Sequence, residues 1–106
     1  MKLLILDDDK DLLDMISRRL SRKEVDCVCA NNIGEAKILY KSTSNIDGIV
    51  CDFYLENGEN GLTFYEENIR GSFQGKFCLA CGQKQRQLSA LLFTDFFVRF
   101  TRTQLF

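Results

Sequence analysis

The sequence contains two groups of carboxylates, each of which follows a short apolar run. Asp7, Asp8 and Asp9 come directly after residues 3–6, and Asp52 comes directly after residues 46–51. Several carboxylates held close together repel one another unless a cation is present. Their hard oxygen atoms suit Mg²⁺, which typically takes one or two protein carboxylates and keeps several waters. A carboxylate can also attack phosphorus and form an aspartyl phosphate, while a metal ion offsets the charge on the phosphoryl oxygens.

These carboxylates can meet only if the elements before them are neighbours in one sheet. The apolar runs 3–6 and 46–51 are typical of parallel strands buried on both faces, and residues 25–30 and 76–81 predict two further strands. Helical spacing predicts helices over residues 10–23, 32–41 and 62–69. Strands that alternate with helices predict a parallel sheet flanked by helices. Ligands bind such sheets beyond the carboxyl ends of the strands, where Asp7, Asp8 and Asp52 would converge.

Composition narrows the chemistry further. The 106 residues predict one domain, and 14 basic against 15 acidic residues leave a net charge of −1, which favours neither nucleic acid nor membrane. No apolar run could span a bilayer, and the N-terminal run is too short for a signal peptide, so we expect a cytoplasmic protein. The absence of histidine removes the commonest general base and zinc ligand. The five cysteines are expected to be reduced thiols.

An alternative interpretation of the first acidic group is structural. Acidic side chains stabilise helix N-termini, so the aspartates after the first strand could simply cap the helix that follows. We adopt this interpretation for Asp9 and Asp11, and we assign Asp7, Asp8 and Asp52 together to a metal and phospho-acceptor site. Cys78 and Cys81 form a lone Cys-x-x-Cys in a predicted strand, which favours buried structural cysteines over a redox or zinc site.

The same residues carry a resemblance to a known family. The stretch "LLILDDD", followed 45 positions after Asp7 by "IVCDFYLENGENG", resembles the receiver domain of two-component response regulators over about residues 2–82. The family's loop Leu and helix-opening Gly are matched by Leu55 and Gly61. The resemblance implies a doubly wound, flavodoxin-like parallel sheet with the phospho-acceptor at the end of the third strand. It also implies a set of site residues: Asp52 as acceptor, and Mg²⁺ held by Asp8, Asp52 and the backbone carbonyl of Tyr54, with Asp7 acting through water.

The chain departs from the family pattern toward its C-terminal end. At the family's Ser or Thr position on the fourth strand it has Cys81, or Ala80 if the register shifts by one residue, and a thiol is the weaker donor. At the family's Lys position it has Phe100 or, one residue earlier, Arg99, which could substitute as a cation. The last helix of the family layout is also expected to be missing.

Residues 83–106 predict a C-terminal segment distinct from the receiver-like core of residues 1–82, within a single domain overall. Their spacing fits either a helix followed by a fifth strand or one long helix. Their large apolar side chains predict an association surface, and hence a homodimer or higher oligomer, unless they fold back over the core. The predicted interface residues are Leu92, Phe93, Phe96, Phe97 and Phe100.

Taken together, the residues and the resemblance predict a stand-alone receiver-like protein. Asp52 would accept a phosphoryl group from a sensor histidine kinase or phosphotransfer protein in a Mg²⁺-dependent phosphorelay, and the signal would pass through protein contacts. We do not expect an enzyme beyond self-catalysed phosphoryl transfer. One alternative is a pseudo-receiver that acts as a phosphorylation-independent binding or oligomerisation module. The other is a small Mg²⁺-dependent phosphohydrolase with Asp7 as nucleophile and Asp9 as the second acid.

Overall fold

The structure, a computed structural model, describes residues 1–80, in which strands and helices alternate as predicted. The strands are β1 (Lys2–Leu6), β2 (Asp26–Ala30), β3 (Gly48–Asp52) and β4 (Lys76–Ala80), and the α-helices are α1 (Lys10–Ser21), α2 (Ile33–Ser42) and α3 (Gly61–Phe64). A 3-10 turn, η1 (Glu56–Gly58), precedes α3, and a π-helical turn, η2 (Tyr65–Ile69), continues it. The predictions for residues 83–106, including the association surface, lie outside the described residues and stay predictions.

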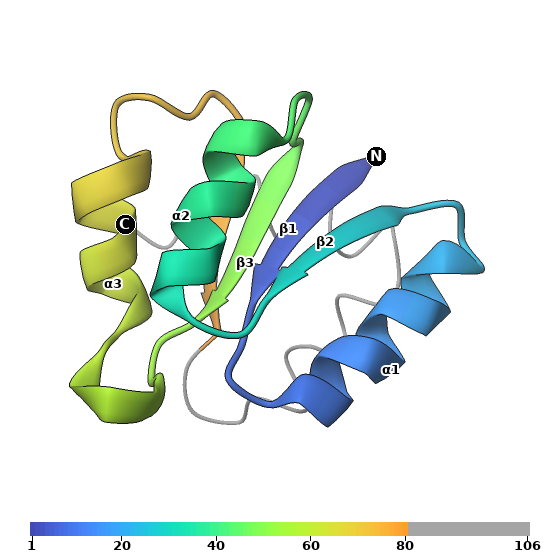
Figure 1. Cartoon of the computed structure of the whole chain (residues 1–106). Helices are drawn as coiled ribbons and strands as arrows, with labels where there is room; N and C mark the ends of the chain where they lie inside the picture. Colours follow the sequence, from blue (N-terminus) through green and yellow to red (C-terminus); the bar gives the residue numbers. More distant parts are fainter. Residues whose placement is uncertain (81–106) are drawn as a thin grey trace.

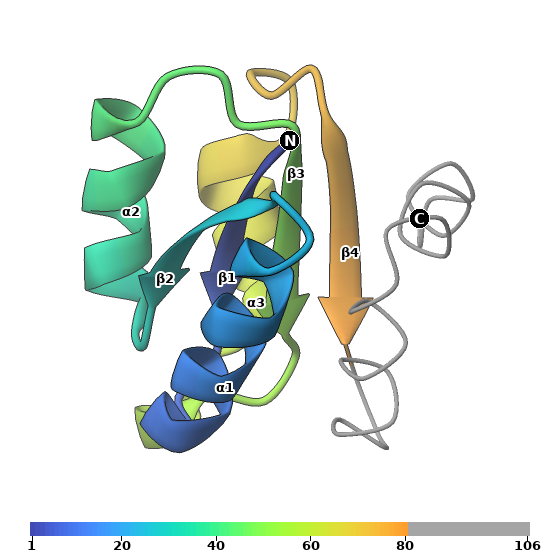
Figure 2. The same ribbon diagram turned by 90° about the vertical axis from the view of Figure 1, so that its right-hand side faces the viewer.

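The four strands form one parallel sheet in the order β2-β1-β3-β4. Figure 1 shows α1 on one side of this sheet and α2 and α3 on the other. In Figure 2 the strand arrows all point toward the same, lower edge. Because β1 and β3 are hydrogen-bonded neighbours, with Leu6 beside Cys51, the residues that follow these two strands emerge side by side. This is the doubly wound, flavodoxin-like arrangement predicted from the sequence.

The core has one layer on each face of the sheet, because successive strand residues point to opposite faces. Leu3, Ile5 and Val50 pack with buried side chains of α1 such as Leu12 and Ile16. Leu4, Leu6 and Ile49 pack on the other face with Ile33 and Ala36 of α2 and Phe64 of α3. All residues of β3 are buried. The continuous apolar runs therefore mark strands covered on both faces, as predicted.

The predicted start of the third strand is wrong, whereas its predicted end at Asp52 is confirmed. The apolar run starts at residue 46, but β3 begins at Gly48 and includes Asp52. Asn45 has a positive φ of 62°, which turns the chain. The backbone of Lys2 then makes two hydrogen bonds to Asp47. Its N–H donates to the Asp47 carboxylate at 2.8 Å, and its carbonyl accepts from the Asp47 N–H at 2.8 Å. These contacts bring the chain into register with β1 two residues later than the apolar pattern indicates.

No disulfide joins the four cysteines within the described residues to one another. Cys51 and Cys78 are buried, whereas Cys27 and Cys29 are half-buried on β2. Burial raises the pKa of Cys27 to about 12 and also raises the pKa values of Cys29 and Cys51. A thiol is nucleophilic as the thiolate, so the raised pKa values of Cys27, Cys29 and Cys51 disfavour reaction of these three thiols near neutral pH. Cys78 is buried, as predicted, whereas Cys81 lies outside the described residues. The reduced state of the thiols stays a prediction.

None of the helices within residues 1–80 is both long and apolar enough to cross a membrane.

Candidate metal centre

The ends of β1 and β3 bring three carboxylates together. Asp7, Asp8 and Asp52 each offer an oxygen, and these oxygens all lie within 4.8 Å of one another. Asp7 is only 1% exposed and Asp52 only 5%, whereas Asp8 is half-buried. The sequence predicts this convergence from two separate strand ends, and the structure contains it. Asp52 is the last residue of β3, so its position is fixed by the sheet itself.

The electrostatics of this cluster favour a cation. Burial disfavours a charged carboxylate, and each neighbouring carboxylate disfavours it further. A bound divalent cation would offset both effects. It would enter the site from solvent past Asp8, the most exposed of the three aspartates. The donors are all hard carboxylate oxygens, with no sulfur or nitrogen among them, which is the donor type that Mg²⁺ prefers. The residues present therefore fit Mg²⁺.

Backbone hydrogen bonds hold Asp7 in place. Its N–H donates to the carbonyl of Ala30 at 3.0 Å, which extends the pairing of β1 with β2 by one residue. Its Oδ1 accepts from the N–H of Asp9 at 2.9 Å. Asp9 in turn caps α1, because its Oδ1 accepts from the N–H of Leu12 at 3.1 Å. The predicted capping role of Asp9 is confirmed, and its carboxylate serves the helix rather than the acidic cluster.

Replacing Asp9 distinguishes its role as the cap of α1 from a role in the acidic cluster. Asp9→Ala should lower the free energy of unfolding by about 1 kcal/mol, the usual cost of removing an acidic N-cap, as measured by urea denaturation. If Asp52 accepts a phosphoryl group, Asp9→Ala should leave that uptake unchanged, because the three clustered carboxylates remain. Loss of phosphoryl uptake without loss of stability would instead support the phosphohydrolase alternative, in which Asp9 acts as the second acid.

The loop after Asp52 is closed back on itself by backbone hydrogen bonds. The N–H of Gly61 donates to the carbonyl of Phe53 at 2.9 Å, and the N–H of Leu55 donates to the carbonyl of Glu59 at 3.1 Å. Between them Tyr54 and Asn60 form an isolated antiparallel bridge. The Tyr54 side chain is 71% exposed. The backbone of Tyr54 is thereby fixed two residues after Asp52, although nothing in the structure tests its carbonyl as a metal ligand.

Gly61 occupies a position where no side chain fits. A Cβ added there would lie 2.5 Å from the carbonyl oxygen of Asp52, 2.6 Å from the Cys51 sulfur and 2.8 Å from Leu79. The Cys51 thiol also donates to the Asp52 carbonyl at 3.3 Å. The start of α3 therefore packs directly against the backbone of Asp52. This close approach is a physical reason for the Gly that the resemblance matches at position 61.

Two sequence-predicted site residues, Cys81 and Arg99, lie outside the described residues. The register of β3 and β4 pairs Asp52 with Ala80, the last described residue. Sequence analysis missed Asn60, whose Oδ1 caps α3 by accepting from the N–H of Thr63 at 2.8 Å. Asn directly before the helix-opening Gly is a capping signal that could have identified it.

Comparison with known proteins gives structural matches only. No protein-family model matches the chain, and no curated protein sequence does. Among solved structures, the chain is similar to the N-terminal domain of a response regulator/sensory box/GGDEF three-domain protein from Carboxydothermus hydrogenoformans. That match has a TM-score of 0.75 and 16% identity over 97% of this chain and 95% of the other.

Two further solved structures match most of the chain at low sequence identity. The non-phosphorylated HemR receiver domain from Leptospira biflexa has a TM-score of 0.69 and 24% identity, over 95% of this chain and 91% of the other. A two-component response regulator from Clostridium difficile has a TM-score of 0.68 and 26% identity, over 91% of this chain and 76% of the other. At these identities the likeness establishes the fold. Together with the parallel sheet and the acidic cluster at its carboxyl edge, it shows that this chain has the fold of a response-regulator receiver domain.

Proposed function

We propose that the protein is a phospho-acceptor in a two-component phosphorelay and that Asp52 receives the phosphoryl group. One observation carries the proposal: Asp7, Asp8 and Asp52 come from two strand ends and place oxygens within 4.8 Å of one another. Carboxylates that merely capped a helix would not need a partner 45 positions away. The solved structures of the same fold include a non-phosphorylated receiver domain and a two-component response regulator, which supports the same assignment.

The proposed roles follow from the placement of each residue. An Asp52 oxygen is the nucleophile, and its position at the end of β3 limits how far it can move during attack. Asp8 and Asp52 would hold Mg²⁺ with the carbonyl of Tyr54, and Asp7 would act through water. Bound there, Mg²⁺ supplies positive charge that offsets the phosphoryl oxygens. Asp9 keeps Asp7 oriented through its N–H, and the closed loop keeps the Tyr54 backbone beside the acidic cluster.

The chain contains no histidine. A phosphohistidine that donates the phosphoryl group must therefore belong to another protein. We therefore propose a sensor histidine kinase or a phosphotransfer protein as the partner. Self-association through residues 83–106 stays a prediction. Light scattering on the full chain at several concentrations would test it, and a mass equal to one chain throughout would contradict it.

The proposal is tested by incubating the purified chain with acetyl phosphate and Mg²⁺ and measuring its intact mass. We expect one phosphoryl adduct per chain, and we expect none when a chelator removes the metal. A native protein that takes up no phosphoryl group with Mg²⁺ present would contradict the proposal.

Mg²⁺ should also change the stability of the protein through the acidic cluster. Mg²⁺ should raise the Tm of the native protein, because it binds the folded state, but should raise that of Asp8→Asn much less. Thermal denaturation followed by circular dichroism measures both effects. Equal Mg²⁺ stabilisation of the two proteins would contradict the assignment of Asp8 as a ligand.

The pseudo-receiver alternative is favoured by one specific feature. The residue paired with Asp52 across β3 and β4 is Ala80, and it is followed by Cys81, so neither residue offers the hydroxyl that the family has on this strand. Phosphorylation could then occur without a change in conformation. Amide NMR spectra before and after acetyl phosphate would distinguish the two functions. Shifts confined to the acidic cluster would favour the pseudo-receiver, whereas shifts extending along β4 would favour a switching receiver.

A further inference from the structure

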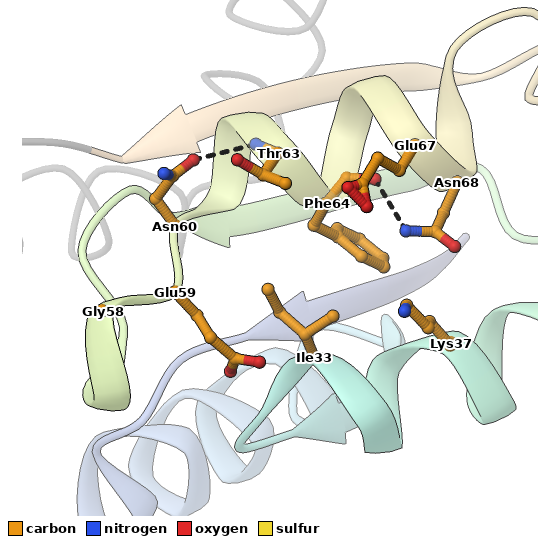
Figure 3. A pocket seen from close by; sticks show the side chains of 9 residues that line it. All are labelled: Ile33, Lys37, Gly58, Glu59, Asn60, Thr63, Phe64, Glu67 and Asn68. Atoms are coloured by element: carbon orange, nitrogen blue, oxygen red, sulfur yellow. Dashed lines mark hydrogen bonds between the residues drawn. The ribbon is translucent and has the colours of Figure 1, made fainter.

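The groove between α2 and the helical segment formed by α3 and η2 does not specify a ligand. Figure 3 shows that Lys37, Glu59 and Glu67 all line it, so charges of both signs meet in one small space. Its apolar residues Ile33 and Phe64 are almost fully buried, with 8% and 1% exposure. Neither its charge nor its apolar surface therefore selects one class of molecule.

A pair of cysteines on the edge strand of the sheet is more specific. Within residues 1–80, β2 ends the strand order and pairs with β1 alone (Figure 1). Cys27 and Cys29 are two residues apart on β2, so their side chains point to the same face. The register places them beside Leu3 and Ile5, and all four belong to the core layer that packs against α1. The sequence Cys-x-Cys thus becomes a pair of thiols on one face of one strand.

These two thiols are open to solvent, unlike the other described cysteines. Cys27 and Cys29 are half-buried, whereas Cys51 and Cys78 are 0% and 1% exposed. An ion can therefore reach the pair without opening of the core. Partial packing against the core layer also restricts how far the two side chains can move. The pair is both accessible and positioned.

The spacing of the pair suits one metal ion bound by both sulfurs. Residues two apart on a strand are separated by about 6.5 Å along its axis, and rotation about the Cα–Cβ bonds can bring their sulfurs closer. Metal–thiolate bonds of about 2.3 Å place two sulfurs on one ion at most about 4.6 Å apart. Burial raises the pKa of Cys27 to about 12, and the neighbouring Cys29 raises it further. The two thiols therefore lie close enough to interact.

The surroundings of the pair disfavour free thiolates and leave a role for a cation. Burial raises the pKa of Cys29, a hydrogen bond with Ser17 of α1 lowers it in part, and the carboxylates of Asp14 and Glu35 raise it further. A metal cation that displaces the thiol protons offsets the charge of the resulting thiolates. The Ser17 hydroxyl is placed to orient the Cys29 sulfur, as outer partners of metal ligands do.

The number and type of ligands decide which metal fits the pair. Within residues 1–80, the acidic cluster is the only group of three or more cysteine or acidic side chains close enough to hold one ion. The thiol pair therefore has no third side-chain ligand in place. Structural Zn²⁺ sites use four protein ligands in a tetrahedron. Soft thiolates select Cu⁺, an ion that two sulfurs can bind in a line, so the pair fits Cu⁺ better than Zn²⁺.

We propose that Cys27 and Cys29 bind one Cu⁺ ion between their sulfurs, with release of both thiol protons to solvent. Each sulfur forms one bond to the ion, and no electron is transferred. Ser17 donates to the Cys29 sulfur and orients it. The site does not rest on the phospho-acceptor function, because the acidic cluster offers hard oxygens alone, and these suit Mg²⁺ rather than Cu⁺.

Copper binding is tested on the full, reduced chain without oxygen. Cu⁺ is supplied as its complex with a coloured chelator, so that transfer to the protein is measured as loss of the chelator's absorbance. Native mass spectrometry counts the ions on each chain. We expect one Cu⁺ per single chain. A chain that takes no copper from the chelator would overturn the proposal, and so would copper found only as a bridge between two chains.

Single substitutions identify the ligands. Cys27→Ser and Cys29→Ser should each weaken copper binding by more than about 100-fold, because a lost ligand costs more than the roughly 10–100-fold of a lost outer partner. Ser17→Ala should weaken binding about tenfold, and unchanged binding would overturn the role of Ser17. Cys78→Ala removes a buried thiol and serves as the matched control, with native binding expected. Circular dichroism first establishes that each variant is folded. Native binding by either Ser variant at position 27 or 29, or an equal loss in Cys78→Ala, would overturn the assigned ligands.

The identity and coordination of the metal are tested on the copper-loaded chain. An excess of Zn²⁺ should leave the bound copper in place. X-ray absorption at the copper edge should show two sulfur neighbours and no oxygen or nitrogen. Displacement of copper by Zn²⁺, or a third or fourth neighbour of the ion, would overturn the two-coordinate Cu⁺ site.

Discussion

Asp52→Asn is expected to abolish the phosphoryl adduct completely while leaving the fold intact. The amide nitrogen and oxygen of Asn are not nucleophilic toward phosphorus, whereas the carboxylate of Asp is. The substitution also removes one charge from a cluster in which Asp7 and Asp52 are buried at 1% and 5% exposure. Asn keeps the size and shape of the Asp side chain, so the variant should fold like the native protein. Intact mass after incubation with acetyl phosphate and Mg²⁺, together with urea denaturation, measures the two effects.

Asp26→Asn provides the matched control for this experiment. Asp26 is the exposed first residue of β2, so the same chemical change there should leave phosphoryl uptake unaltered. An adduct of native yield in Asp52→Asn would contradict the assignment of the acceptor. Loss of the adduct in both variants would show that uptake depends on overall charge rather than on Asp52.

Gly61→Ala should give the largest loss of stability among the substitutions considered for this site. The added Cβ would meet the Asp52 carbonyl oxygen, the Cys51 sulfur and Leu79 at 2.8 Å or less. Two of these atoms belong to the packed residues of β3, so the start of α3 must move away from the strand. Overpacking of this kind typically costs about 1–3 kcal/mol. We expect urea denaturation to show a loss in that range. Uptake of the phosphoryl group should also slow, because the displaced backbone carries Asp52 and the loop after it.

Gly34→Ala is the matched control for steric crowding. Gly34 lies in the first turn of α2, and a Cβ there would meet only the Asn32 side chain, at 3.3 Å. Alanine also has the higher helix propensity by about 1 kcal/mol, so stability should change little or rise. If Gly61→Ala were as stable as Gly34→Ala, the start of α3 would not pack against Asp52 as closely as the structure shows.

The parts of the fold that could be predicted are those in which a local pattern and the tertiary environment agree. Residues 3–6 are apolar without interruption because β1 is covered on both faces, so the strand is evident from the sequence alone. α1 was predictable for a similar reason, since Leu12, Leu13, Ile16 and Leu20 form a single buried stripe. The convergence of Asp7 with Asp52 followed once both runs were recognised as parallel strands.

The features that were missed depend on contacts between distant residues. The start of β3 is set by hydrogen bonds between Asp47 and Lys2, which no local pattern encodes.

The most direct test of the central claim is to locate the phosphoryl group by chemical trapping. Borohydride reduces an aspartyl phosphate to homoserine, and peptide mass spectrometry then identifies the modified position. After incubation with acetyl phosphate and Mg²⁺, we expect homoserine at position 52 and aspartate at every other acidic position of the cluster. Homoserine at position 7 or 8, or unmodified aspartate at position 52 despite a measured adduct, would contradict the assignment of Asp52 as the phospho-acceptor.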